Sequence, residues 1–138
     1  MGTPSMNKLY GKIVFIESSG DMSIVDADVR GDTFSTIVLE TPQSAPYLKI
    51  GEEVTLLFKE TEVSIGKNLS GMMSLRNRIS SRIKKLTSGG ILTQVVLDYK
   101  GQEIVSIISS RSARGLNLKS GDDVEWLVKT NEISLLKE

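Results

Sequence analysis

The sequence predicts an all-β protein built from two similar five-stranded barrels in tandem. Two observations support this prediction. Shifted by 70 residues, the second half of the chain aligns with the first half without a gap. Within each half, short β-branched runs alternate with glycine- and serine-containing turns, a pattern typical of antiparallel strands. An internal repeat of this kind shows how many similar folding units a chain contains.

The repeat is supported by identical residues along its whole length. They include Asn7/Asn77, Ile13/Ile83, Gly20/Gly90, Val25/Val95, Gly31/Gly101, Gly51/Gly121, Val54/Val124 and Lys59/Lys129. Chance similarity between two β-rich stretches would give far fewer identities in one register. We therefore predict two units, residues 5–67 and 74–138, joined by a linker at 68–73.

Each unit is expected to contain five short strands, with one short helical turn between the third and the fourth. The expected strands cover 12–17, 23–29, 34–39, 54–58 and 63–65 in the first unit, and 82–86, 92–99, 103–108, 124–128 and 133–136 in the second. Gly31-Asp32 and Lys100-Gly101 are typical hairpin turns. The final strand is expected to close its own unit. Five strands in this order favour a small OB-like barrel.

The size of each unit predicts an assembly. A unit of about 65 residues buries a thin core and is marginally stable alone. Packing on its twin, and on further copies of the chain, would supply the missing buried surface. A homo-oligomer, either a dimer or a trimer, is therefore expected.

Charge and residue content exclude several classes of function. Lys and Arg together number 17, as do Asp and Glu, so there is no general attraction to nucleic acid or to an acidic membrane. The absence of cysteine and histidine excludes disulfides, thiolate metal sites and Cys-His dyads. No apolar run approaches the roughly 18 residues of a membrane span, and the N-terminus lacks a secretory signal. We expect a cytoplasmic protein without a metal cation or an organic cofactor.

The cationic residues are unevenly distributed. No acidic residue lies between Glu62 and Asp98, whereas that segment contains Lys67, Arg76, Arg78, Arg82, Lys84 and Lys85. A solvated basic stripe is one interpretation. The tetrapeptide Ser74-Leu75-Arg76-Asn77 favours another. A hydroxyl, a guanidinium and successive backbone N–H groups at a strand entrance are donors suited to an anion.

These residues resemble a known family. Ser-x-Arg-Asn is followed at suitable distances by Leu116-Asn117-Leu118-Lys119-Ser120-Gly121 and by Leu127-Val128-Lys129. Together the motifs resemble the molbindin family, the Mop or TOBE domains of small molybdate-binding proteins and molybdate-responsive regulators. The resemblance covers essentially the whole chain as two consecutive units. It implies an OB-like fold and a molybdate or tungstate oxyanion bound where units meet.

The resemblance assigns oxyanion-binding roles to residues of the second unit. Ser74 and Arg76 would donate from their side chains and Leu75 from its backbone N–H, with Asn77 completing the tetrapeptide. The remaining candidates follow the third and fourth strands, and they are Ser109, Ser112, Lys129 and Thr130. Because sites in the family are usually completed across an interface, these residues need not converge within one unit.

The first unit departs from this pattern. Lys59 matches Lys129, but the other equivalent positions carry Pro4 for Ser74, Met6 for Arg76, Leu39 for Ser109 and Glu60 for Thr130. The carboxylate of Glu60 would repel a dianion. One complete site per chain is therefore expected, and Lys59 belongs at most to a secondary one.

The assigned residues also have structural interpretations. Arg76 suits an ordinary surface arginine, and Lys129 suits a lysine whose stem covers an apolar strand. Ser109 and Ser112, in a Ser-Ser-Arg-Ser run, form a good helix N-cap. Trp126 is expected to pack in the core or at an interface.

Hydrogen-bond chemistry supports the same ligand. Molybdate is a full dianion at neutral pH and offers only acceptors, so a pocket made wholly of donors suits it. Monohydrogen phosphate carries a proton that needs an acceptor, and an unpaired group costs roughly 1–3 kcal/mol.

Other functions fit parts of the sequence. The chain could be the effector-binding fragment of a molybdate-responsive transcription regulator or of a transporter ATPase, instead of a storage or buffering protein. An oligonucleotide-binding OB module would need aromatic residues among the basic ones, and none lies beside the basic segment. The acid pairs Glu52-Glu53 and Asp122-Asp123 are typical of solvated turns, so an enzyme is not expected.

Overall fold

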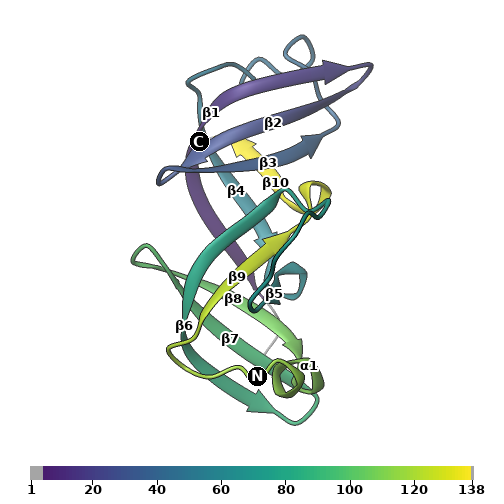
Figure 1. Ribbon diagram of the computed structural model, residues 1–138. Coiled ribbons are helices and arrows are strands. Elements are labelled where there is room, and N and C mark those ends of the chain that lie inside the picture. Colours follow the sequence, from purple (N-terminus) through teal and green to yellow (C-terminus); the bar gives the residue numbers. More distant parts are fainter. Residues whose placement is uncertain (1–4, 138) are drawn as a thin grey trace.

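A computed structural model describes residues 5–137 and confirms the all-β tandem architecture. The strands are β1 (Met6–Ser19), β2 (Met22–Val29), β3 (Asp32–Val38), β4 (Glu53–Lys59), β5 (Ser64–Gly66), β6 (Asn77–Gly89), β7 (Leu92–Tyr99), β8 (Gln102–Ser109), β9 (Asp123–Val128) and β10 (Ser134–Lys137). The helices of this part of the chain are η1 (Glu60–Glu62), α1 (Ser110–Gly115) and η2 (Thr130–Glu132). Figure 1 shows two curled sheets, one above the other. No helix among the described residues has the length and apolar character to cross a membrane.

The long first strand of each repeat bends its sheet into a half-barrel. In β1, the segment from Met6 to Lys12 pairs with β4, and the segment from Lys12 to Ser19 pairs with β2. The register shifts between Ile13 and Phe15. The equivalent strand β6 divides its pairing between β9 and β7 in the same way, with an equivalent shift. A bulge bends a strand and increases its twist, so the two halves of one long strand can pair with different neighbours in a curled sheet.

Two-residue hairpins join the second and third strands of both repeats. Arg30 and Gly31 have φ values of 52° and 91°, and Lys100 and Gly101 have 49° and 89°. Two successive positive φ angles are typical of the type I′ turn, which matches the twist of the flanking strands. The first turn therefore lies one residue before the predicted Gly31-Asp32, because Asp32 already pairs with Val29 in the ladder.

The repeats differ between their third and fourth strands. The second repeat forms the expected helical turn as α1, whereas the first repeat forms a run of hydrogen-bonded turns over 41–48. In that run the Ala45 N–H donates to the Thr41 carbonyl at 2.8 Å, which is a single helical turn. Pro46 has no N–H to continue it, and its ring disfavours a longer helix.

The final strands of the two repeats are exchanged. The expectation that each would close its own unit is wrong, because β5 pairs with β9 and β10 pairs with β4. In Figure 1 the yellow β10 lies within the upper sheet and the teal β5 lies beside the lower one. The three-residue helices carry the chain from one repeat to the other, since η1 packs on β8 of the second repeat and η2 packs on β3 of the first. Each sheet therefore mixes strands of both repeats, and the predicted boundaries of the two units stay a prediction.

Two asparagines clamp the repeats together by equivalent hydrogen bonds. Asn77 is 1% exposed. The Ser35 N–H donates to Asn77 Oδ1 at 2.7 Å. Asn77 Nδ2 donates to the Ser35 carbonyl at 2.8 Å and to the Val128 carbonyl at 3.0 Å. In the other direction, Asn7 Nδ2 donates to the Val105 carbonyl, and Val105 N–H donates to Asn7 Oδ1, both at 2.9 Å. The repeat relates Asn7 to Asn77 and Val105 to Ser35, so these paired bonds reflect an internal two-fold pseudosymmetry, to which Asn77 adds a bond to Val128 of its own repeat.

Two buried hydroxyls follow the same symmetry. Thr36 Oγ1 donates to the Ile133 carbonyl, and Ser106 Oγ donates to the Val63 carbonyl, each at 2.6 Å. Both acceptors lie directly before an exchanged strand. These bonds therefore hold β10 and β5 in the opposite repeat.

The two hairpin turns also contact each other. Arg30 Nη1 donates to the Lys100 carbonyl at 2.7 Å, and Lys100 Nζ donates to the Arg30 carbonyl at 2.8 Å. Asp32 accepts from the Tyr99 hydroxyl at 2.7 Å and pairs with Lys100 Nζ at 3.0 Å. Burial raises the pKa of Asp32, but these two contacts outweigh it and hold the pKa below its usual range. Burial and the bond to Asp32 raise the pKa of Tyr99.

The repeats share one aromatic core, which confirms the expected packing role of Trp126. Its ring stacks on Phe58 at 5.6 Å and lies 5.7 Å from Phe34, both from the first repeat. Tyr99 meets Trp126 edge-on at 5.7 Å. All four rings are fully buried. Aromatic pairs at such separations add about 0.5–1.5 kcal/mol each beyond their buried area, so the interface between repeats is also the centre of the core.

We expect Asn77→Ala to lower the free energy of unfolding by about 3 kcal/mol or more. The substitution leaves an N–H group and two carbonyls without a partner in a dry site, and each unpaired group costs about 1–3 kcal/mol. Asn7→Ala should cost less, because Asn7 makes two such bonds and is less buried. Urea unfolding measures both, with the exposed Asn131→Ala as control. Equal effects for all three variants would contradict the clamp.

We expect the isolated second repeat, residues 68–138, to form a dimer by exchanging β10. This fragment lacks both β5, the neighbour of β9, and β4, the neighbour of β10. The β10 strand of one copy can occupy the vacant edge of β9 in the other. Sedimentation analysis measures the mass, and a fragment ending at residue 133 is the control that should not form this dimer. A stable folded monomer of residues 68–138 would contradict the exchange.

Candidate functional site

Predicted donors of the second repeat lie together where β6 begins and β9 ends. The pairing of Asn77 with Val128 places the segment 74–76 beside residues 129 and 130. Ser74, Arg76 and Lys129 are exposed, and Thr130 is half-buried. Within residues 5–137 the side chains of these four donors form no hydrogen bond or ion pair. The structure therefore provides a cluster of free donors where β9 ends and η2 begins, which we call the η2 end.

A cavity of 260 Å³ adjoins the η2 end. It brings Arg76 and Thr130 together with strands of the opposite repeat, and it is lined by Phe15, Glu17, Ile24, Asp26, Ser35, Arg76 and Thr130. Asp26 Oδ1 accepts a hydrogen bond from Ser35 Oγ at 2.6 Å. The two carboxylates in this wall would oppose a dianion inside the cavity. Ser74 and Lys129 lie outside its lining, so the exposed side of the η2 end is the part suited to an anion.

Asn77 has a structural role that excludes its side chain from the site. Its Oδ1 accepts from Ser35, and its Nδ2 donates to the Ser35 and Val128 carbonyls. An amide nitrogen carries two donor hydrogens, so no side-chain donor remains for a ligand. The tetrapeptide Ser74-Leu75-Arg76-Asn77 thus ends in a residue that fixes the start of β6 against the other repeat.

Ser109 and Ser112 lie at a different place, beside α1, which we call the α1 end. Ser112 N–H donates to Ser109 Oγ at 3.0 Å, and Ser109 Oγ donates to Ser112 Oγ at 2.9 Å. The helix N-cap interpretation of these serines is therefore confirmed. In Figure 1 α1 lies at the bottom, whereas η2 is the small yellow coil between β9 and β10, at the right near the middle of the molecule. One chain does not bring the two ends together.

The α1 end contains two cations outside the set of residues predicted from the sequence. Ser109 lines a cavity of 290 Å³ with Arg111 and Arg114, both of them exposed. Their guanidinium groups form no ion pair within the described part of the chain. The signal was present in the sequence, because both arginines lie in the same helical turn that Ser109 caps.

The equivalent end of the first repeat offers fewer donors. Lys59 is exposed, whereas Glu60 is 8% exposed. Leu39, the repeat equivalent of Ser109, is also exposed but corresponds to the α1 end. Ser5 Oγ donates to Glu60 Oε2 at 2.9 Å, and Ser5 N–H donates to Glu60 Oε1 at 3.4 Å. Pro4, which replaces Ser74 in the repeat, lies outside the described residues.

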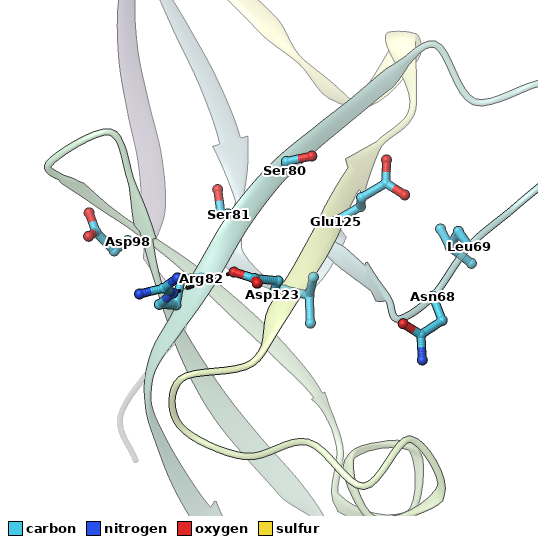
Figure 2. A pocket seen from close by; sticks show the side chains of 9 residues that line it. Asn68, Leu69, Ser80, Ser81, Arg82, Asp98, Asp123 and Glu125 are labelled. Carbon is cyan, nitrogen blue, oxygen red and sulfur yellow. Dashed lines mark hydrogen bonds and ion pairs between the residues drawn. The ribbon is translucent and has the colours of Figure 1, made fainter.

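A larger cavity of 640 Å³ lies on the outer face of the second repeat, and Figure 2 shows its side chains. It is lined by Asn68, Leu69, Ser80, Ser81, Arg82, Asp98, Asp123, Val124 and Glu125. Arg82 Nε pairs with Asp123 at 3.4 Å, as the dashed line in Figure 2 marks. Three carboxylates and one paired cation make this cavity unsuitable for a dianion.

The acid pair at 122–123 is used in turns and ion pairs. Lys67 Nζ donates to Asp122 Oδ2 at 3.0 Å, and the Lys119 N–H donates to the same oxygen at 2.9 Å. These hydrogen bonds lower the pKa of Asp122. Asp123 pairs with Arg82. Neither acid is held in an arrangement that resembles a catalytic pair.

Comparisons with known proteins agree with the tandem β fold. The TOBE domain family matches residues 73–135. Molybdenum-pterin-binding proteins 1 and 2 of Clostridium pasteurianum are each 32% identical over 65 residues, which cover 46% of this chain and 96% of each relative. The crystal structure of the cytoplasmic molybdate-binding protein ModG, with molybdate bound, superposes with a TM-score of 0.89 at 26% identity and covers 96% of both chains.

We expect Ser109→Ala to lower the free energy of unfolding by about 1 kcal/mol, since it removes the N-cap of α1. Chemical denaturation measures the loss. Ser80→Ala is the matched control, because Ser80 is exposed and its hydroxyl makes no hydrogen bond within residues 5–137. If the two variants were equally stable, the cap would have no energetic role.

Proposed function

The chain belongs to the Mop family of TOBE-domain proteins, and on this premise we propose that it binds molybdate as a tetrahedral dianion. The observation that carries the proposal is the cluster of free donors at the η2 end. Arg76 and Lys129 supply two positive charges, and Ser74 adds a hydroxyl. The likeness to ModG over nearly the whole chain supports the same ligand, since that protein was crystallised with molybdate.

The donors of the η2 end suit an ion that only accepts hydrogen bonds. Charge-assisted hydrogen bonds from arginine and lysine are about twice as strong as neutral ones. The backbone N–H groups of Leu75 and Thr130 are further candidate donors. The proton of monohydrogen phosphate would find only the Ser74 and Thr130 hydroxyls to accept it, because guanidinium, ammonium and backbone N–H groups are donors only. Tungstate has the charge and shape of molybdate, so we propose that it binds as well.

We further propose that the site is completed between copies of the chain. The α1 end supplies Ser109, Ser112, Arg111 and Arg114, but it lies away from the η2 end of the same chain. A homo-oligomer, either a dimer or a trimer, would allow the α1 end of one copy to approach the η2 end of another. Ile91 supports this arrangement, because it is 82% exposed and lines the same cavity as Ser109. Exposed apolar side chains beside polar groups are typical of interaction surfaces.

The proposed role is cytoplasmic storage, buffering or sensing of the oxyanion, and each requires this binding step. The relatives are named for binding and none for catalysis, which supports a binding protein over an enzyme. An oligonucleotide-binding role is less well supported, because Phe34, Phe58, Tyr99 and Trp126 are buried and unavailable for base stacking.

Calorimetric titration of the full chain with molybdate, tungstate, sulfate and phosphate tests the proposal. We expect molybdate and tungstate to bind, and phosphate to bind much more weakly. Absence of binding by molybdate and tungstate at millimolar concentration would overturn the proposed function.

We expect Arg76→Ala and Lys129→Ala each to weaken molybdate binding about tenfold or more, in line with roughly 1.5–3 kcal/mol for a hydrogen bond to a charged group. Lys59→Ala, the repeat equivalent of Lys129→Ala, should have a smaller effect. Arg82→Ala removes a cation that is already paired with Asp123 and controls for general charge. If Lys59→Ala were the most damaging of these variants, the first repeat would hold the main site.

A further inference from the structure

The first repeat contains a buried carboxylate at the position that corresponds to the η2 end. Glu60 is the repeat equivalent of Thr130, the first residue of η2, and it is the first residue of η1. Its side chain points inward, since the residue is 8% exposed. A buried carboxylate is costly unless its oxygens accept hydrogen bonds. The partners of Glu60 therefore indicate what this end of the repeat is built to hold.

Both oxygens of Glu60 are bound by Ser5. The Ser5 hydroxyl donates to Oε2 at 2.9 Å, and the Ser5 N–H donates to Oε1 at 3.4 Å. The Glu60 N–H in turn donates to the Ser5 carbonyl at 3.1 Å. These three bonds fasten the residue just before β1 to the helical turn that follows β4.

Ser5 corresponds to Leu75 in the repeat, and the Leu75 backbone N–H is one of the donors proposed for the oxyanion. The carboxylate of Glu60 thus accepts from the N–H group that matches a ligand-binding donor in the second repeat. At the η2 end no corresponding hydrogen bond between Leu75 and Thr130 is formed within the described residues. A threonine side chain is shorter and uncharged, so it leaves both that N–H and the neighbouring space to a ligand.

We propose that the Glu60 carboxylate is a built-in substitute for the oxyanion. It closes the place where Ser5 and Glu60 meet, which we call the first-repeat end, and so restricts the ligand to the η2 end. The inference rests on the proposed function, because it assigns the same kind of anion to the equivalent place. A carboxylate attached to the chain is present at a high effective concentration, and its negative charge repels an incoming dianion. The first-repeat end is therefore held together without ligand, whereas the η2 end gains its anion only from solution.

Amide NMR during titration of the full chain with sodium molybdate tests this assignment residue by residue. In the wild-type protein we expect the signals of Leu75, Arg76 and Thr130 to shift, while those of Ser5 and Glu60 stay unchanged. Shifts of Ser5 and Glu60 equal to those at the η2 end would overturn the inference without any variant.

Glu60→Thr restores the residue of the second repeat and should open the first-repeat end. We expect the signals of Ser5 and residue 60 to shift with molybdate in this variant, at an affinity about tenfold or more below that of the η2 end, because Met6 replaces the arginine there. Glu62→Thr is the matched control. It removes a carboxylate from the same turn, one that accepts from the Lys59 N–H and does not contact Ser5, so it should behave as wild type.

The possible outcomes separate the two proposals. Shifts at the η2 end in every variant, with none at Ser5 in a folded Glu60→Thr protein, would overturn the inference and leave the proposed function standing. No shift at either end of the wild-type protein would overturn the proposed function and this inference with it. A shift at Ser5 in Glu62→Thr as large as in Glu60→Thr would show that general charge, and not the Glu60 carboxylate, controls access.

Discussion

The exchange of the final strands is the constraint on which the rest of the structure depends. Because β5 completes the sheet of the second repeat and β10 completes that of the first, neither sheet can form fully from one repeat. The symmetry-related bonds of Asn7 and Asn77 reinforce the exchange, since each joins one repeat's first strand to the other's third. Trp126 stacks on Phe58 across the same boundary. The chain thus folds around one shared core, which overcomes the small size of each unit.

The exchange also determines where the donor groups lie. A three-residue helix carries the chain from β9 into β10 of the opposite sheet, and its first residue, Thr130, lies beside the start of β6. The crossing therefore places Lys129, Arg76 and the neighbouring backbone at a surface between the repeats. The same topology places Ser109 at the far end of the molecule, where α1 begins. Two separated donor groups in one chain favour a site assembled from copies, which links the fold to the proposed oligomer.

Duplication has produced a symmetric framework with asymmetric ends. Side chains that hold the repeats together are preserved in both, as the Thr36 and Ser106 bonds to opposite carbonyls illustrate. Groups at the ends have diverged, so that Glu60 of the first repeat is bound by Ser5 while Thr130 of the second leaves its surroundings open. Framework positions are constrained by the partner repeat, since a change there leaves a buried group unpaired. The exposed η2 end carries no such constraint, so it can be specialised for a ligand.

The sequence by itself determined the number of repeats and the order of strands along each, because local periodicity and turn residues act over a few positions. It also predicted the N-cap of α1 and the packing of Trp126. Only the tertiary structure decided which repeat each final strand joins, since equivalent strands have the same pattern and fit either sheet. Long-range contacts likewise decided the role of Asn77, which binds Ser35 in place of a ligand. They also separated Arg76 from Ser109 and enclosed the Glu60 carboxylate.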